Sequence, residues 1–221
     1  MKKLLAFKTL TLATIAFVTG GTSIAWAVPI TITTGNPNNQ STENVLFNDG
    51  SLSHSGTLVQ GNFSGSGTGF IVDFTSSSGN NEIAGSGGQA TITGLTGNDP
   101  FQCLTFGLEG GATFTKAIFN PDATGDGTID FFVNYSSGSQ FTQSFTLNGN
   151  GQNFFGIEAA DGELISSITF CSSDTAFRDA SQFRLGGFTR ATSNVPDGGA
   201  TSLLLGAGLT ALGAGRRFLK L

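Results

Sequence analysis

The sequence predicts an all-β fold, an antiparallel β-sandwich with jelly-roll-like topology. Short runs of β-branched and aromatic residues recur at intervals of about 8 to 12 residues through the middle of the chain. Turn-forming residues separate these runs, as in Asn148-Gly149-Asn150-Gly151. No segment between residues 28 and 194 keeps the apolar period of about 3.6 residues that marks a helix. About ten strands without intervening helices are typical of two packed antiparallel sheets.

The run at residues 140–147 is the clearest expected strand. Phe141, Phe145 and Leu147 alternate with polar residues, so one face can be buried while the other is solvated. The run at 128–135 is also rich in β-branched and aromatic residues. The other expected strands follow a lead-in strand and loop at 28–42 and cover residues 57–63, 69–75, 89–93, 102–108, 112–120, 153–159, 164–170 and 182–189.

Phenylalanine supplies most of the material for a core. The chain has 21 phenylalanines, and all but Phe7, Phe17 and Phe218 lie between residues 28 and 194. Each buried phenylalanine contributes on the order of 1.5 to 3 kcal/mol to folding. This segment is therefore expected to fold as one domain of ordinary size.

The same segment is strongly acidic. Its four bases against 14 acids give a net charge of −10, whereas the whole chain carries −5. Nucleic acid binding needs clustered lysine and arginine, so this composition excludes a nucleic acid partner. Cations, neutral sugars and other proteins remain as partners for an acidic domain. The four bases are Lys116, Arg178, Arg184 and Arg190.

The first 27 residues have the pattern of a secretory signal peptide. Three lysines precede an apolar run at 10–18, and Ala25 and Ala27 are the small residues that signal peptidase reads. The pattern predicts a signal helix at 1–27 that is removed on export. The alternative is a permanent N-terminal membrane helix, which the short apolar run disfavours. The lysines are Lys2, Lys3 and Lys8.

The last 27 residues predict a sorting tail. Residues 201–215 carry no charge and span about 22 Å as a helix, less than the roughly 30 Å of a bilayer core. Arg216, Arg217 and Lys220 favour a cytoplasmic location for the terminus. A short span of this kind predicts transient insertion in the inner membrane before cleavage. The alternative is a buried C-terminal helix of a soluble protein.

The residues that open this tail carry a family resemblance. Val195, Pro196, Asp197, Gly198 and Gly199 resemble the Val-Pro-Asp-Ser/Gly-Gly variant of the PEP-CTERM sorting signal. The resemblance implies processing by exosortase and delivery to the cell surface or extracellular matrix, where biofilm polysaccharide is a potential partner. It also implies contact with the export and sorting machinery. The expected layout is a signal peptide at 1–27, an extracellular domain at 28–194 and a sorting signal at 195–221.

One stretch of the domain resembles the front of a calcium loop. Counted from Asp122, oxygen-bearing side chains fall at the first, third, fifth and ninth positions, and glycine falls at the sixth. Val133 stands where such a loop has its bidentate glutamate. One hypothesis is therefore a calcium site, and the other is a plain β-hairpin turn. The candidate ligands are Asp122, Thr124, Asp126 and Asp130.

Cys103 and Cys171 are the only cysteines. An even count in an exported domain favours a disulfide, and two separate buried thiols are the alternative. His54 is the only histidine and lies in a polar stretch, so it is expected in a surface loop. These counts exclude metal sites built from several histidines or cysteines.

No motif assigns a catalytic residue or a cofactor other than calcium. Glu158, Asp161 and Glu163 lie close in sequence and leave a carboxylate-dependent hydrolase open. The domain has no tryptophan, and Tyr135 is the only tyrosine, so flat platforms for sugar rings are scarce. The first hypothesis is therefore a non-enzymatic surface protein with a structural or adhesive role. The second is a carbohydrate-binding module, assisted by calcium in one version.

Overall fold

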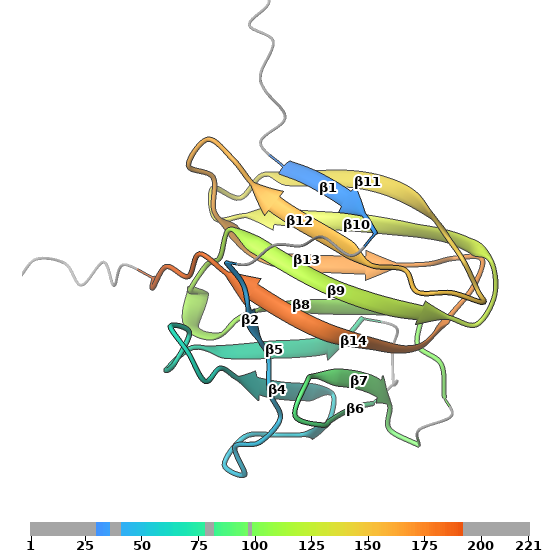
Figure 1. Ribbon diagram of the computed structural model, residues 1–221, viewed down its shortest axis with the longest axis horizontal. Coiled ribbons are helices and arrows are strands. Elements are labelled where there is room, and N and C mark those ends of the chain that lie inside the picture. The colour runs from blue at the N-terminus through green and yellow to red at the C-terminus, as the bar shows by residue number, and fades with distance from the viewer. Residues whose placement is uncertain (1–29, 36–40, 78–81, 97–98, 192–221) are drawn as a thin grey trace, which may run out of the picture.

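The computed structural model describes residues 30–35, 41–77, 82–96 and 99–191. In this part of the chain, two antiparallel β-sheets face each other, which confirms the predicted β-sandwich (Figure 1). The expected signal helix and sorting helix lie outside the described residues. Among the residues described, no helix is long and apolar enough to cross a membrane.

Sheet A has eight strands in the order β1-β12-β9-β14-β7-β6-β3, with β2 also paired to β14. All of its pairings are antiparallel. The strands are β1 (Ile30–Thr34), β2 (Glu43–Asn44), β3 (Ser55–Gly56), β6 (Ile83–Ser86), β7 (Thr91–Gly94), β9 (Lys116–Ala123), β12 (Phe155–Ala159) and β14 (Phe177–Gly186).

Sheet B has six antiparallel strands in the order β11-β10-β13-β8-β5-β4. A short 3₁₀ turn, Glu109–Gly111, follows β8. The strands are β4 (Leu58–Asn62), β5 (Ile71–Ser76), β8 (Cys103–Leu108), β10 (Gly127–Tyr135), β11 (Gln140–Leu147) and β13 (Ile165–Cys171).

The last eight strands have the connectivity of a jelly roll. Strand β10 pairs with β11, β9 with β12, β8 with β13 and β7 with β14, so the chain forms one long antiparallel double ribbon. Successive members of this ribbon alternate between the two sheets, and the added pairings of β9 with β14 and of β10 with β13 complete the two layers. Strands β1, β3, β4, β5 and β6 extend the edges of this framework, and β2 pairs with the internal strand β14.

Alternation along the strands builds the core between the sheets. In β8, Leu104, Phe106 and Leu108 are buried, and the residues between them face outward and are half-buried. The ring of Phe119 in sheet A stacks on Phe170 in sheet B at 5.2 Å between centroids. Ring pairs of this kind stabilise a core by roughly 0.5 to 1.5 kcal/mol beyond the area that they bury. The rings therefore hold the two sheets together.

Most expected strands are present, and two differences have a physical reason. Strand β11 has the expected bounds, because its alternation is uninterrupted. Strand β14 begins at Phe177, five residues before the expected start, because two register shifts interrupt its period of two. Gln182, at the second shift, has a positive φ of 58°. The sequence also missed β6, a short strand that contains only two apolar residues.

Candidate functional site

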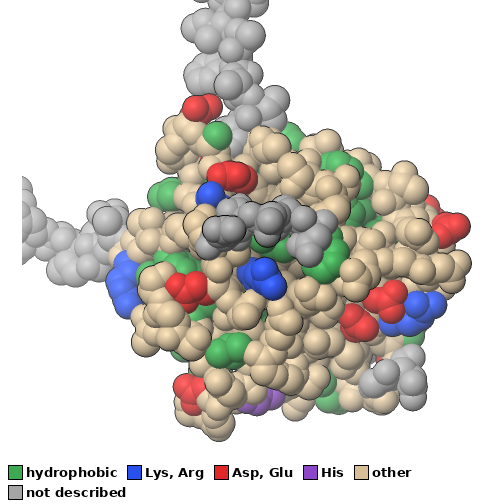
Figure 2. Space-filling model, in the orientation of Figure 1, with side chains coloured by type: hydrophobic (Ala, Val, Ile, Leu, Met, Phe, Trp, Pro, Cys, Tyr) green, Lys and Arg blue, Asp and Glu red, His purple; other side chains and the backbone are tan. Residues whose placement is uncertain are grey.

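An open cavity of about 520 Å³ lies on sheet A, where β9 and β14 run beside the loop at 148–152. Phe119 and Ala123 of β9 are in the core, so Asn120 and Asp122, which alternate with them, face the cavity on the outer side. We call this the β9–β14 cavity. Its lining is polar and consists of Asn120, Asp122, Gly149, Asn150, Gly151, Gln152, Arg178, Asp179, Ser181 and Gln182. Charged side chains are few on this face, and acidic and basic ones adjoin near the right-hand end of β14 (Figure 2).

Two carboxylates stand side by side on the strands that form the floor of the cavity. Asp179 of β14 is the register partner of Asp122 of β9. Burial, and then the neighbouring Asp122 carboxylate, raise the pKa of Asp179 above its ordinary value, while Arg178 opposes the rise. The site therefore holds one carboxylate that is more easily protonated than a free aspartate.

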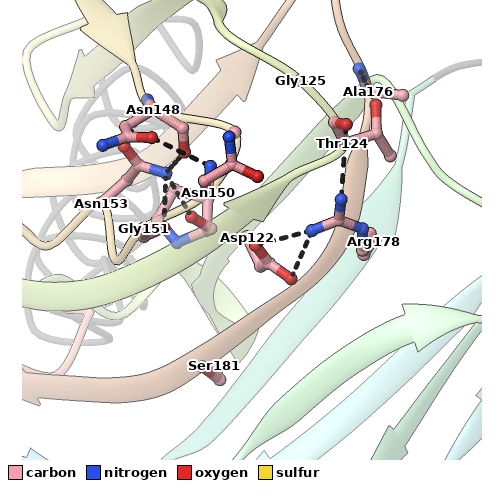
Figure 3. A network of polar contacts seen from close by, with 12 residues as sticks. Asp122, Thr124, Gly125, Asn148, Asn150, Gly151, Asn153, Ala176, Arg178 and Ser181 are labelled. Atoms are coloured by element: carbon pink, nitrogen blue, oxygen red, sulfur yellow. Dashed lines mark hydrogen bonds and ion pairs between the residues drawn. The ribbon is translucent and has the colours of Figure 1, made fainter.

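Arg178 is the only basic residue in the lining of the cavity. It occupies the extra position where the β14 register shifts between Phe177 and Asp179. Its Nη1 atom lies 3.3 Å from each carboxylate oxygen of Asp122, and its Nη2 donates to the Thr124 carbonyl at 3.3 Å (Figure 3). The pair is exposed to solvent, so it adds little to stability. Its main effect is to orient Asp122 and the guanidinium at the cavity.

The loop at 148–152 forms a wall of the cavity, and hydrogen bonds of Asn148 and Asn153 hold it in place (Figure 3). The Asn153 Oδ1 accepts from the Asn148 backbone N–H at 2.8 Å, and its Nδ2 donates to the Asn148 carbonyl at 2.9 Å. Asn148 in turn accepts from the Asn150 backbone N–H at 2.9 Å, which closes a tight turn. Asn153 also joins the loop to β9, because its backbone N–H donates to the buried Asn120 Oδ1 at 2.8 Å. The wall is therefore fixed to the strand that forms the floor.

A glycine lets this loop approach a second connection. The Gly149 backbone N–H donates to the Asp126 Oδ1 at 2.8 Å. A Cβ atom at position 149 would lie 2.7 Å from the Asp126 backbone nitrogen and would overlap the Gly125 backbone. Close packing of the two backbones therefore requires glycine at this position.

The four candidate calcium ligands are not brought together. Each takes a different partner, and the described residues contain no group of three or more acidic, histidine or cysteine side chains that could hold a metal ion. The partners of Asp122, Thr124, Asp126 and Asp130 are, in that order, the Arg178 guanidinium, the Thr175 hydroxyl, the Gly149 backbone N–H and the Ser144 hydroxyl.

The alternative, a β-hairpin with its turn at Asp126 and Gly127, is wrong. Strand β9 belongs to sheet A and β10 to sheet B, so residues 124–126 carry the chain from one layer to the other. Aspartate and glycine residues of this stretch are compatible with a calcium loop, with a hairpin turn and with this crossover. The pairing of the flanking strands distinguishes the crossover from the hairpin.

Cys103 and Cys171 form a disulfide, which is the pairing that the even count favoured. They are register partners on β8 and β13, with 4.1 Å between their Cα atoms. Both alternate with buried residues, so the bridge lies on the outer face of sheet B, on the opposite layer from the β9–β14 cavity.

His54 lies in a loop, as expected, but its ring is half-buried against Phe47, with 5.8 Å between the ring centroids. Of the three carboxylates that left a hydrolase open, Glu158 pairs with Lys116 at 3.0 Å, and Asp161 and Glu163 lie in the connection after β12. None of these side chains lines the β9–β14 cavity.

The sequence indicated only part of this site. Asp122 was identified for a different chemistry, and the Asn-Gly repeat at 148–151 was interpreted only as a turn. Arg178 and Asp179 were missed because they lie before the expected start of β14. One feature of the sequence could have indicated them: Arg178 and Asp179 form a charged pair directly after the apolar Phe177, in a domain with only four basic residues.

Comparisons with known proteins add little. No known protein family matches the sequence, and no curated protein matches it. A solved structure that resembles the chain is the family 11 carbohydrate-binding module of cellulosomal cellulase Lic26A-Cel5E of Clostridium thermocellum. The identity is 12%, and the match covers 77% of this chain and 94% of that module, with a TM-score of 0.26. This TM-score is too low to carry an inference.

Proposed function

We propose that this chain is a non-catalytic, exported protein of the cell surface or extracellular matrix, with an adhesive role, and that it holds a neutral polysaccharide in the β9–β14 cavity. The observation that carries the ligand class is the polar lining of this cavity. Carboxylates, amides and a guanidinium converge there, and none of the lining residues is aromatic.

A chain of sugar hydroxyls suits this set of groups. Each hydroxyl both donates and accepts a hydrogen bond, carboxylates accept, a guanidinium donates, and the amides of Asn150, Gln152 and Gln182 do both. Without an aromatic platform, affinity rests on hydrogen bonds that replace those to water. We expect a dissociation constant on the order of 0.1 to 1 mM for a short oligosaccharide.

Other ligand classes suit the cavity less well. An anion would meet two carboxylates in a domain of charge −10. A hard cation would compete with Arg178 for the oxygens of Asp122. An apolar ligand would find few apolar groups with which to replace water.

The two aspartates do not have the arrangement of a glycosidase pair. Asp122 and Asp179 stand side by side on adjacent strands of one sheet, so both lie on the floor of the cavity. Glycosidase carboxylates flank the bond that is broken. Asp122 is also held through both oxygens by Arg178. We therefore infer binding without hydrolysis.

Binding can be tested with the full chain on an array of neutral and acidic polysaccharides. We expect selective binding to neutral glycans and no release of reducing sugar. The variant Gln152→Ala/Gln182→Ala removes two amides from the cavity and should weaken binding roughly tenfold. Gln102→Ala is the matched control, because Gln102 is exposed and lies outside the lining. Equal binding by both variants would show that the ligand does not bind in this cavity.

Export is a separate part of the proposal and rests on the resemblance of residues 195–199 to the PEP-CTERM signal. Mass spectrometry of the protein recovered from the surface of a bacterium that produces it should show a chain that begins at Val28 and lacks the basic end at 216–221. A recovered chain that keeps both ends would contradict this part and leave the cavity proposal untouched.

A further inference from the structure

Strand β11 is a free edge of sheet B. It pairs with β10 along its whole length, from Gln140 to Leu147, and no other strand among the described residues pairs with its second side. Along such an edge, every second residue points its backbone N–H and carbonyl groups away from the sheet. An uncovered row of this kind can pair with another strand.

The strand lacks the devices that usually protect an edge. Its sequence, Gln-Phe-Thr-Gln-Ser-Phe-Thr-Leu, contains no charge, proline or glycine, and its pairing with β10 has no register shift. The opposite edge of sheet B is different. There Asn62 exchanges two backbone hydrogen bonds with Leu46, and the Gln60 N–H donates to the Ser53 carbonyl at 2.6 Å. Within the described part of the chain, protection is thus present at β4 and missing at β11.

Two aromatic side chains lie on this edge. Phe141 and Phe145 pack against the core, yet both remain partly exposed, because none of the described strands lies beyond β11. A further strand beside β11 would remove the rest of these rings from water.

The residue pattern of β11 is complementary to itself. When two copies run antiparallel with Gln143 opposite Gln143, Phe141 of each copy lies opposite Phe145 of the other. Thr142 then lies opposite Ser144. Both pairs keep core-facing residues on the core face and outer residues on the outer face, as a continuous sheet requires. The two-fold axis makes the contact close on itself as a dimer.

From this geometry we propose that β11 is a self-association strand, through which two copies of the chain join their six-stranded sheets edge to edge. The occupant is a second copy because of this aromatic and hydroxyl match. Association brings together two domains of charge −10 through an uncharged strand. Added salt should therefore strengthen the dimer. This proposal does not depend on the sugar ligand.

The test compares two double variants that share one substitution. In Thr142→Lys/Ser144→Lys, lysines of the two copies would face each other across the contact. In Thr142→Glu/Ser144→Lys, opposite charges would face each other. Both variants lose the hydrogen bond between Ser144 and Asp130, and both positions are exposed, so their thermal unfolding should be alike.

Sedimentation of the full chain over a range of concentrations gives the readout. We expect the wild type to dimerise, the double-lysine variant to dimerise at least about tenfold more weakly, and the opposite-charge variant to keep the dimer. A wild-type chain that stays monomeric up to about 0.1 mM would overturn the proposal. So would equal association, or an equal loss of association, in the two double variants.

Discussion

Asp179 lies directly opposite Asp122 on the two strands that form the floor of the β9–β14 cavity, and Arg178 binds Asp122 through both carboxylate oxygens. The arginine thus compensates the charge of one aspartate and opposes the rise in the pKa of the other only in part. This unequal pair defines the electrostatics of the site.

Replacing Asp179 with asparagine should stabilise the fold at neutral pH. Burial and Asp122 raise the pKa of Asp179 in the folded state, so folding favours its protonated form and stability falls as pH rises through that pKa. The amide that the Asp179→Asn variant carries at this position has no charge at any pH, so the variant avoids this loss. We expect a gain of about 1 kcal/mol or less in the free energy of unfolding.

Urea unfolding at several pH values measures this effect. The gain should be present at pH 7 and should disappear below the ordinary pKa of aspartate, because both proteins are then neutral at this position. Asp73→Asn, on the outer face of sheet B, is a control for the loss of a carboxylate elsewhere. A gain that does not change with pH would refute the electrostatic explanation.

Asn153→Ala should destabilise the protein and loosen the cavity wall. The buried amide of Asn153 bonds to both backbone groups of Asn148 and donates to the Pro121 carbonyl at 3.2 Å. Loss of this amide leaves the buried Pro121 carbonyl and two backbone groups of the loop without their partner, and should cost about 1 to 3 kcal/mol. Asn134→Ala, which removes two partly exposed hydrogen bonds on sheet B, should cost less in the same thermal unfolding assay. An equal loss of stability in both variants would mean that the hydrogen bonds of Asn153 contribute no more to folding than those of Asn134.

Gly149→Ala tests the packing of the loop against the crossover at 124–126. The added methyl group would overlap the Gly125 backbone, so the loop must move, at a cost of about 1 to 3 kcal/mol. Gly50→Ala is the control, because a Cβ atom there would have no neighbour within 4 Å. Chemical denaturation should show a loss for the first variant and no loss for the second. A Gly149→Ala variant as stable as the wild type would show that the loop has room to shift.

The disulfide should matter for stability and leave ligand binding unchanged. Cys103 and Cys171 are 68 residues apart in sequence, so their bond closes a long loop in the unfolded chain. Its loss in Cys103→Ser/Cys171→Ser should lower the free energy of unfolding by about 2 to 4 kcal/mol. Because the bridge lies on the other sheet from the cavity, glycan affinity should stay within about twofold of wild type at a temperature where the variant is folded. A large loss of affinity there would link the bridge to the site.

The positions of strands could be predicted from the sequence where apolar and polar residues alternate regularly. The alternating Phe141, Phe145 and Leu147 gave β11 its correct bounds, and the absence of helical periodicity indicated the sandwich. Strand β14 was placed too late because its register shifts, one of them at Gln182, break the alternation.

The site could not be assembled from sequence because it depends on pairing between distant strands. Asp122 and Asp179 are 57 positions apart in the sequence and become neighbours only through the register of β9 and β14. The aspartate spacing after Asp122 indicated local chemistry, whereas the chain crosses there between layers. Cys103 and Cys171 were the exception, since two cysteines allow only one pairing.

Hydrogen–deuterium exchange of the full chain, with and without a neutral polysaccharide that it binds, tests the central claim most directly. Ligand in the β9–β14 cavity should slow exchange in the loop at 148–152 and in residues 178–182, and should leave the outer strands β4 and β5 of sheet B unchanged. Protection confined to sheet B, or no protection in the loop at 148–152 and in residues 178–182, would contradict the account.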